Sequence, residues 1–250
     1  MILDPRVESA KHQLRSVRAV YPVMSVKGGV GKSTLTVMLS LALRELGFRV
    51  GVLDTDLSNP SLHYLYGLEQ RKVDVEEDEG YVPPLVHDGI RLSSPVIFTE
   101  GGILPARDKD SVNAVLELLA ITNWRDVDVV LIDTPPGIHD EQLRLLKLMS
   151  GVHTGISRPV IVTTPFKVSL ANVSRSLDYI NSLHKGEKIL VINKHRGRDE
   201  LSMQASFKCV LRVPWDERLD ERLVSLEELL QSKAYAELRR QVHSGKDCFF

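Results

Sequence analysis

The residues best suited to chemistry lie in one glycine-rich segment that carries two lysines and two hydroxyl side chains. It reads Ser25-Val26-Lys27-Gly28-Gly29-Val30-Gly31-Lys32-Ser33-Thr34. Glycines let a backbone curl so that successive N–H groups point at one anion, and a following helix adds the positive end of its dipole. In such a loop we expect Lys32 to reach the β- and γ-phosphates of a nucleotide and Ser33 to ligate Mg²⁺. The segment therefore predicts a phosphate-binding loop for Mg-ATP.

The ordinary pattern of such loops, G-x-x-x-x-G-K-[ST], requires a glycine at position 26, where this chain has Val26. A deviant pattern, K-G-G-x-G-K-[ST], is instead matched at every fixed position. Its mark is a second lysine, Lys27, five residues before Lys32. The pattern makes Lys27 a candidate catalytic residue beside Lys32. The cradle itself comprises the residues from Gly28 to the hydroxyl pair, namely Gly28, Gly29, Val30, Gly31, Lys32, Ser33 and Thr34.

Two further segments place carboxylates where a phosphate loop needs them. Val50–Leu53 leads into Asp54 and Asp56, and Val127–Ile132 leads into Asp133 and a Thr-Pro-Pro-Gly turn. Ligand groups collect at the carboxyl ends of parallel strands, and Mg²⁺ prefers hard oxygen ligands. We expect Asp133 to hold Mg²⁺ through water, Asp54 to join its shell, and Asp56 to orient the attacking water. The alternative is that these carboxylates only cap the turns that follow their strands.

A second pair of strand ends offers groups for recognising the base. Ile189–Ile192 leads into Asn193, and Val210–Val213 leads into Pro214. A carboxamide can pair a donor and an acceptor with N6 and N7 of adenine. We therefore expect Asn193 to read the base, with the loop that begins at Pro214 packed nearby. An asparagine in this place is also a common turn former.

Short apolar runs alternate with longer segments of helical period along the chain. The runs are nearly continuous in apolar character, as in strands covered on both faces. Such alternation predicts an α/β fold, with a mostly parallel central sheet flanked by helices on both faces. The expected strands are Val20–Val26, Val50–Leu53, Val127–Ile132, Pro159–Thr163, Ile189–Ile192 and Val210–Val213. The expected helices are Lys32–Leu46, Ser111–Ile121, Glu141–Met149, Val168–Leu183 and Leu223–Val242.

A chain of 250 residues suits one such domain, a single P-loop NTPase domain over residues 1–250. Residues 1–18 form an N-terminal extension, and residues 223–250 a C-terminal helix and tail. Leu68–Pro105 breaks the strand–helix rhythm and predicts an excursion on the rim of the sheet, with one extra strand near Ile90–Ile97. Its acidic run at positions 74–79 is expected to be a solvated loop, with a docking site as the alternative.

Composition bears on partners and location. A net charge of −1 argues against a protein that coats nucleic acid, so we expect no nucleic-acid partner. No apolar run approaches the roughly 20 residues that span a bilayer, and the first ten residues lack the apolar core of a signal peptide. We expect a cytoplasmic protein without a membrane anchor. The two cysteines, Cys209 and Cys248, cannot make a disulfide framework and match no zinc pattern.

Together these motifs resemble the deviant Walker A class that includes MinD, ParA, the nitrogenase iron protein and the Mrp-type iron–sulfur carriers, and they are most similar to the Mrp type. The resemblance covers roughly residues 18–235 and includes the segment after Asp54, Asp133 with Asp140 after it, and Val162-Thr163-Thr164-Pro165. It implies ATP hydrolysis, slow without a partner, and a homodimer across the nucleotide site in which Lys27 reaches the partner's ATP. The expected partners are thus a second copy of the chain and a protein client of unknown identity.

The chain departs from that family in the cysteines that would bind an iron–sulfur cluster. Mrp carriers typically hold a bridging cluster through a C-x-x-C pair after the strand equivalent to Ile189–Ile192, and here Lys194–Lys208 contains no cysteine. We expect Cys209 to be buried, Cys248 to be incidental, and the chain to bind no iron–sulfur cluster. The sequence thus favours a nucleotide-dependent dimeric switch in metal-centre assembly. The alternatives are a MinD- or ParA-like positioning or partition ATPase and a non-hydrolysing nucleotide-binding module.

Overall fold

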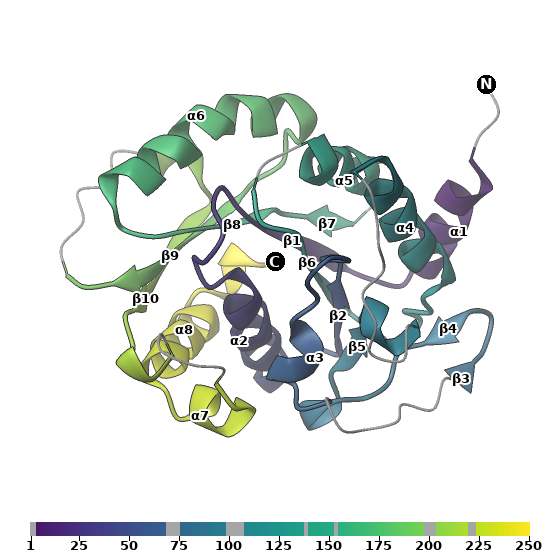
Figure 1. Cartoon of the computed structure of the whole chain (residues 1–250), viewed down its shortest axis with the longest axis horizontal. Helices are drawn as coiled ribbons and strands as arrows, with labels where there is room; N and C mark the ends of the chain where they lie inside the picture. Colours follow the sequence, from purple (N-terminus) through teal and green to yellow (C-terminus); the bar gives the residue numbers. More distant parts are fainter. Residues whose placement is uncertain are drawn as a thin grey trace.

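A twisted parallel sheet forms the centre of the molecule (Figure 1). The structure, a computed structural model of the chain, describes residues 4–68, 76–98, 108–137, 140–152, 155–197, 204–219 and 224–250. Within these residues the strand order is β10-β9-β8-β1-β6-β2-β5, and every neighbouring pair is parallel. The strands are β1 (Ala19–Ser25), β2 (Val50–Asp54), β5 (Arg91–Ser93), β6 (Val129–Asp133), β7 (Ile156–Ser157), β8 (Val160–Thr163), β9 (Ile189–His195) and β10 (Cys209–Pro214). Short β7 pairs with the start of β1.

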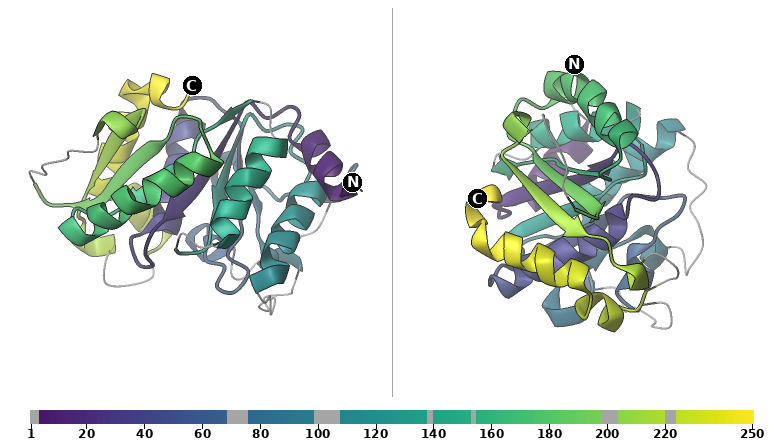
Figure 2. Two further views of the ribbon diagram at one scale, coloured as in Figure 1. Left: turned by 90° about the horizontal axis from the view of Figure 1, so that it is seen from above. Right: turned by 90° about the vertical axis from the view of Figure 1, so that its left-hand side faces the viewer.

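Helices cover both faces of this sheet, as the two further views in Figure 2 show. One face is covered by α2 (Lys32–Glu45), α3 (Leu62–Leu65), α7 (Leu226–Leu230) and α8 (Lys233–Ser244). The other is covered by α1 (Pro5–Gln13), α4 (Asp108–Ile121), α5 (Asp140–Val152) and α6 (Lys167–Leu183). Short 3₁₀ turns occupy His87–Gly89, Pro95–Phe98, Gln204–Ser206, Glu217–Leu219 and Lys246–Cys248.

The near-continuous apolar character of the strands follows from this double covering. In β1, Tyr21 and Val23 pack into the core beneath α2 and α8, whereas Val20 and Met24 belong to cores on the opposite face. Successive side chains of a strand point to opposite faces, so both sets must be apolar. The predicted α/β fold is confirmed, and each of the six expected strands is found within about three residues of its predicted bounds.

The C-terminal helical segment differs from the prediction. Leu223 lies outside the described residues, and the remainder forms two helices, α7 and α8, rather than one. Ser225 begins α7 with a capping box to Glu228, and the Ser232 hydroxyl accepts the N–H of Tyr235 to begin α8. Serine favours such caps over helix interiors, which explains the break. Both helices pack on the sheet, with Leu229, Ala234, Leu238 and Val242 buried and Leu226 and Leu230 partly buried.

The rim excursion contains an extra strand, as predicted, but β5 covers only Arg91–Ser93 of the expected Ile90–Ile97, and Pro95–Phe98 forms a 3₁₀ turn instead. Strand β5 extends the sheet beyond β2. A two-stranded antiparallel hairpin, β3 (Glu76–Glu77) and β4 (Tyr81–Val82), precedes it. The described part of the acidic run is exposed, although Asp78 and Glu79 form ion pairs with Arg125. Asp74 and residues 99–105 of the excursion lie outside the described residues.

Strand β10 is an edge strand whose outer side is closed by a side chain of α8. The Gln241 carboxamide accepts the N–H of Arg212 at 2.9 Å and donates to its carbonyl at 2.7 Å. This amide replaces a neighbouring strand at that position and ties α8 to β10. In the described part of the chain, no helix is long and apolar enough to cross a membrane.

Candidate functional site

The phosphate loop joins the end of β1 to the start of α2, as the motif predicts. Gly29 and Gly31 have φ values of 74° and 84°, in the left-handed region that favours glycine. A Cβ atom on Gly31 would lie 2.5 Å from Nδ2 of Asn193. Glycine is therefore required at position 31 for two reasons: its backbone conformation and the close approach of Asn193. The loop brings Lys32 and Ser33 into the first turn of α2.

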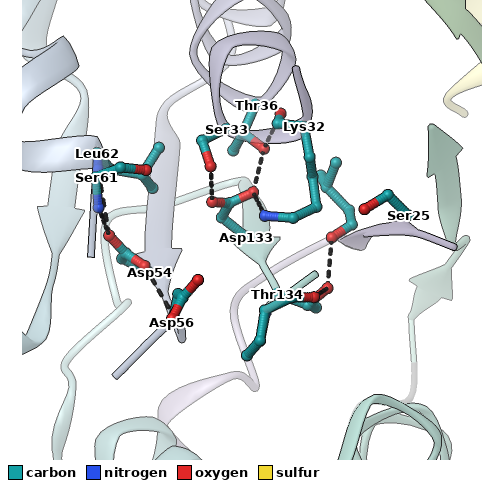
Figure 3. A network of polar contacts seen from close by, with 12 residues as sticks. Ser25, Lys32, Ser33, Thr36, Asp54, Asp56, Ser61, Leu62, Asp133 and Thr134 are labelled. Carbon is teal, nitrogen blue, oxygen red and sulfur yellow. Dashed lines mark hydrogen bonds and ion pairs between the residues drawn. The ribbon is translucent and has the colours of Figure 1, made fainter. Parts of the chain in front are cut away.

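The carboxylate of Asp133 lies at the centre of the site and accepts hydrogen bonds from several side chains (Figure 3). Asp133 ends β6, is 1% exposed, and accepts three hydrogen bonds from the first two turns of α2. Lys32 Nζ and Thr36 Oγ1 donate to Oδ1 at 2.8 and 2.9 Å, and Ser33 Oγ donates to Oδ2 at 2.7 Å. The three predicted residues Lys32, Ser33 and Asp133 thus meet.

Thr36 was not predicted as a site residue. It follows Lys32 by one helical turn, and residues four apart in a helix share a face. That spacing is the signal that could have identified it. Its hydroxyl also donates weakly to the Lys32 carbonyl at 3.1 Å. Thr36 therefore helps to hold the Asp133 carboxylate in place beneath the loop.

Asp54 lies beside Asp133, because the two residues are paired across β2 and β6. Its carboxylate is fully buried and accepts backbone N–H groups of Asp56 at 3.1 Å, Ser61 at 3.1 Å and Leu62 at 3.2 Å. Burial, and secondly the charge of Asp133, raises the pKa of the Asp54 carboxyl to about 7. Asp54 thereby organises the 54–62 turn; its predicted place in a Mg²⁺ shell stays a prediction.

Asp56 lies just beyond the end of β2, within the turn that Asp54 organises. It is half-buried, and its Oδ1 atom accepts the N–H of Asn59 at 3.0 Å. Figure 3 shows Asp56 next to Asp54, to which its backbone N–H donates. Its predicted role in orienting water stays a prediction.

The segment after Asp133 is tied to the phosphate loop. The Thr134 hydroxyl donates to the Val23 carbonyl at 2.9 Å, and the Gly137 N–H donates to the Ser25 carbonyl at 3.0 Å. A Cβ atom on Gly28 would lie 3.7 Å from Pro136. The Thr-Pro-Pro-Gly turn thus contacts the loop directly, which suits a segment that responds to what the loop binds. The Asp140 side chain lies outside the described residues.

A pocket of about 220 Å³ adjoins the phosphate loop and contains both residues predicted to recognise the base. Asn193 and Pro214 come from the ends of β9 and β10, which are neighbours in the sheet. Nδ2 of Asn193 donates to the Val30 carbonyl at 2.8 Å, so this side chain also supports the loop. The remaining lining residues are Gly29, Gly31, Thr34, Leu35, Met38, Lys194, Trp215, Asp216, Leu219 and Ala234.

The wall formed by Trp215 and Asp216 was predicted only as a neighbouring loop. The Arg196 guanidinium lies over the Trp215 ring at 4.0 Å, which fixes the indole against the pocket. Asp216 is 7% exposed and accepts the N–H groups of Arg218 at 3.2 Å and Lys233 at 2.9 Å. This carboxylate joins the loop after β10 to the start of α8. The pocket thus has an aromatic side chain, Trp215, in its lining, which suits contact with a base.

Lys27 differs from Lys32 in its surroundings. Its side chain is exposed, while its carbonyl accepts the Ser25 hydroxyl at 2.9 Å. It lies on the surface of the loop, outside the buried cluster around Asp133. This is the placement expected of a group that acts on a second molecule.

Two predictions, that Cys209 is buried and that Cys248 is incidental, were wrong, whereas the expected lack of an iron–sulfur cluster stays a prediction. Cys209 is half-buried rather than buried, and it forms a disulfide with Cys248, which is 6% exposed. The two residues are 39 apart in sequence. Pattern analysis could not pair them, because β10 and the returning α8 bring them together only in the folded chain. The sequence of Lys194–Lys208 contains no C-x-x-C pair.

The chain matches the family model of ParA, described as the NUBPL iron-transfer P-loop NTPase, over residues 16–195. It is 37% identical over 173 residues to the cytosolic Fe-S cluster assembly factor Nubp2 homolog of Drosophila erecta, a match that covers 66% of this chain and 64% of that protein. It is 35% identical over 177 residues to the iron-sulfur cluster carrier protein of Helicobacter pylori, covering 70% and 47%. The match thus spans less than two thirds of the length of these relatives.

Solved structures agree with the fold. A nucleotide-binding protein of Archaeoglobus fulgidus in complex with ADP has a TM-score of 0.66 and 26% identity, covering 94% of this chain and 96% of that one. The cell division ATPase MinD of Pyrococcus furiosus has a TM-score of 0.59 at 18% identity, covering 91% and 99%, a likeness of fold alone. The match to the family model ends at residue 195, before the Pro214 loop, α8 and both cysteines.

Proposed function

The chain belongs to the ParA family of P-loop NTPases of the NUBPL iron-transfer type, and from this premise we propose that it is a Mg²⁺-dependent ATPase. We propose further that it works as a homodimeric switch in the assembly of iron–sulfur centres. The observation that carries the proposal is the buried cluster in which Lys32, Ser33 and Thr36 all donate to Asp133.

The site has the groups that Mg-ATP requires. The left-handed glycines Gly29 and Gly31 leave the loop backbone open to an anion, and Lys32 supplies a positive charge. The described residues contain no group of three or more His, Cys, Asp or Glu side chains that could hold a metal. Ser33 and Asp133 would therefore hold Mg²⁺ together with phosphate oxygens and water, as this ion commonly requires. When bound, Mg²⁺ neutralises charge on the phosphate oxygens.

Nucleotide binding would change the partner of Lys32. In the structure the Lys32 side chain is 7% exposed, and its ammonium is paired with Asp133. To contact the phosphates, Lys32 must leave that carboxylate, and the freed Asp133 then becomes available to a hydrated cation. The exchange couples the loop to the Thr-Pro-Pro-Gly turn that follows Asp133. It supplies the two states that a nucleotide switch needs.

Hydrolysis would depend on the turn after β2. Asp54, through its three backbone N–H partners, holds the 54–62 turn and thereby Asp56. Asp56 is half-buried and has one oxygen engaged by Asn59, which leaves the other to accept from water. We assign Asp56 to the attacking water, and we assign Asp54 to the positioning of Asp56 in addition to its predicted place in the Mg²⁺ shell. The base would occupy the pocket between Asn193 and Trp215.

The partner at this face would be a second copy of the chain. Lys27 is exposed on the loop, and Phe166 and Val168 are 69% and 63% exposed at the start of α6. Because Val162 of β8 is paired with Ser25 of β1, α6 begins next to the loop. An apolar pair beside an exposed lysine suits a two-fold contact that brings each Lys27 to the opposite ATP. Such a charge supplied in trans accelerates phosphoryl transfer by about 10³–10⁵ for arginine fingers.

The iron–sulfur cluster would be cargo held by a partner protein. The only two cysteines of the chain are joined to one another, at the sheet edge opposite the nucleotide site. Clusters normally require four cysteine ligands. We therefore propose that this chain supplies the ATP-driven switch and that its client supplies the cluster ligands. The class of client is proposed from the names of the relatives, which refer to cluster assembly and carriage.

Two assays test these proposals. Phosphate release from Mg-ATP should be measurable in the wild type and should fall at least tenfold in Asp56→Asn, which keeps the size of the side chain. Unchanged release in the variant would remove Asp56 from the reaction. After anaerobic reconstitution with iron and sulfide, the reduced protein should hold no stoichiometric chromophore. A stoichiometric cluster that is lost in Cys209→Ala would show that the chain carries the cargo itself.

A further inference from the structure

The disulfide joins two segments that belong to different structural elements. Cys209 is the first residue of β10, and Cys248 ends the 3₁₀ turn Lys246–Cys248 that follows α8. Their Cα atoms are 5.8 Å apart, within the usual range for a bridge. The chain has no other cysteine, so no internal thiol competes for either partner. Both residues lie beyond residue 195, outside the part that matches the family.

The bridge closes the far end of a unit whose near end forms the base pocket. From Cys209, β10 runs toward the pocket and ends at Pro214, and Trp215 and Asp216 follow in the wall. Asp216 accepts the N–H of Lys233 at the start of α8, and Ala234 also lines the pocket. Helix α8 then returns along β10 toward the C-terminus, as the right-hand view of Figure 2 shows, and the turn after α8 contains Cys248. The bridge and the Asp216 contact therefore fasten the two ends of one unit.

The segment that carries Cys248 is also held without the disulfide. Phe249 is fully buried and packs edge-on against Tyr21, whose hydroxyl donates to the Phe249 carbonyl. Phe250 stacks on Phe48 at 4.3 Å between ring centroids, and Arg158 donates to the Cys248 carbonyl at 3.3 Å. These contacts would keep the two thiols adjacent after reduction. The bond can therefore open and close again while the chain stays folded.

We propose that Cys209 and Cys248 form a reversible thiol–disulfide site, which exchanges with small disulfides and whose oxidation tightens the nucleotide pocket. The coupling to nucleotide rests on the proposed function, whereas the exchange does not. Closing the 39-residue loop restricts the ways in which β10 and α8 can separate. A pocket wall that has fewer alternative arrangements loses less conformational entropy when the ligand binds, so the ligand binds more tightly.

The exchange is a two-electron reaction that a small disulfide, such as oxidised glutathione, can complete. Cys209 is the more exposed of the pair, so its thiolate attacks one sulfur of the small disulfide and releases one small thiolate. The Cys248 thiolate then attacks the Cys209 sulfur of this mixed disulfide and releases the second. The protein loses two electrons and two protons, and the small disulfide is reduced to two thiols.

The first experiment concerns the site alone. Reduced protein is incubated under native conditions in buffers of varied glutathione to glutathione disulfide ratio, quenched with acid, and labelled with a maleimide after denaturation. Mass spectrometry should show the two thiols disappearing together, within one chain, and returning together with excess thiol. Single glutathione adducts, or bonds between chains, as the main product would overturn the proposal. So would a disulfide that opens only when the chain is unfolded.

The second experiment measures the coupling on the same wild-type protein, oxidised and reduced. We expect the oxidised form to bind an ATP analogue about 3–10-fold more tightly and to melt about 5–10 °C higher. Cys209→Ala and Cys248→Ala should each match the reduced wild type under both conditions, which excludes effects of the redox buffer. Equal affinities in the two forms would overturn the coupling. Failure of both forms to bind nucleotide would instead contradict the proposed function, while thiol counting would still decide the exchange.

Discussion

Lys32 and Asp133 form a buried ion pair, with 2.8 Å between Nζ and Oδ1, in the place where a nucleotide and its cation would bind. The side chains are 7% and 1% exposed, so neither charge is effectively solvated by water. Breaking a buried pair by removing one partner leaves an uncompensated charge. The pair therefore stabilises the nucleotide-free state, and phosphate oxygens must replace Asp133 as the partner of Lys32.

Replacing Lys32 with alanine should abolish ATP binding and also lower the free energy of unfolding. We expect a loss of about 3 kcal/mol, because Asp133 would keep only the hydroxyl donors of Ser33 and Thr36. Calorimetry with ATP and denaturant unfolding measure the two effects. The double variant Lys32→Ala/Asp133→Asn, which removes the second charge, should recover about 1–2 kcal/mol but no ATP binding. Near-normal ATP affinity in Lys32→Ala would remove the phosphate-loop assignment.

Gly31 offers a test of the close approach between the loop and Asn193. Gly31→Ala should destabilise the protein and weaken ATP binding, because the added Cβ meets Nδ2 of Asn193 at 2.5 Å. Gly47 is the matched control, since its φ of 91° is similar and nothing lies within 4 Å of its added Cβ. Gly47→Ala should cost about 1–2 kcal/mol from backbone strain alone. Equal losses in the two variants would show that the Asn193 contact has no effect.

The apolar start of α6 should contribute to the contact between two copies. Phe166→Ser is expected to weaken ATP-dependent dimerisation about tenfold, because it removes a large exposed apolar surface next to the loop. ATP binding to the monomer should not change. Tyr179→Ser alters an aromatic residue that is 52% exposed nearer the other end of the same helix, so it serves as the control. Equal dimerisation constants for Phe166→Ser and the wild type, measured by analytical ultracentrifugation, would exclude this face.

The stability of the sheet should depend on pH through Asp128. Three hydrogen bonds from Arg49, at 2.9–3.0 Å, lower the pKa of Asp128 to about 2. A lowered pKa in the folded state stabilises the protein above the unfolded pKa, and this contribution is lost as the pH falls from about 4 to about 2. Asp128→Asn should cost about 1 kcal/mol at pH 7, since the largely exposed Arg49 weakens the pair. The difference should shrink to about half at pH 3.

Asp126→Asn is the control for this titration, because Asp126 is 53% exposed and pairs with Arg91 at 2.7 Å. Burial raises the pKa of the Asp126 carboxyl, but the hydrogen bond and charge of Arg91 outweigh burial and leave this pKa lowered. The loss in this variant should be smaller at every pH. A cost of Asp128→Asn that stays constant from pH 7 to pH 3 would mean that the carboxylate charge does not contribute.

The sheet and the phosphate loop could be predicted because their determinants are local in sequence. The motif from Lys27 to Thr34 contains its own turn residues, and the apolar runs identify buried parallel strands. Asn193 and Pro214 were placed together correctly, because the carboxyl ends of parallel strands share one edge. These are properties of pattern and topology, which a single sequence contains.

Other features depend on contacts between residues far apart in the chain. The disulfide exists because α8 returns to the start of β10, and no spacing rule encodes that return. The hydrogen bonds that Asp54 accepts from the N–H groups of Ser61 and Leu62 depend on the path of a turn, which the sequence pattern does not show. Thr36 and Trp215 became site residues only when α2 and the loop after β10 were seen beside the nucleotide pocket.

If ATP binding at this site drives two copies of the chain together, the mass of the protein in solution must depend on the bound nucleotide. The most direct test is the mass of the protein in solution, measured by light scattering with Mg-ATP and again with Mg-ADP. The wild type should shift from the 28.0 kDa of one chain to twice that mass with Mg-ATP and return with Mg-ADP. Lys27→Ala should bind Mg-ATP with similar affinity yet remain near the mass of one chain. A wild type that binds Mg-ATP and has the same mass with Mg-ATP as with Mg-ADP would show that ATP binding does not drive dimerisation.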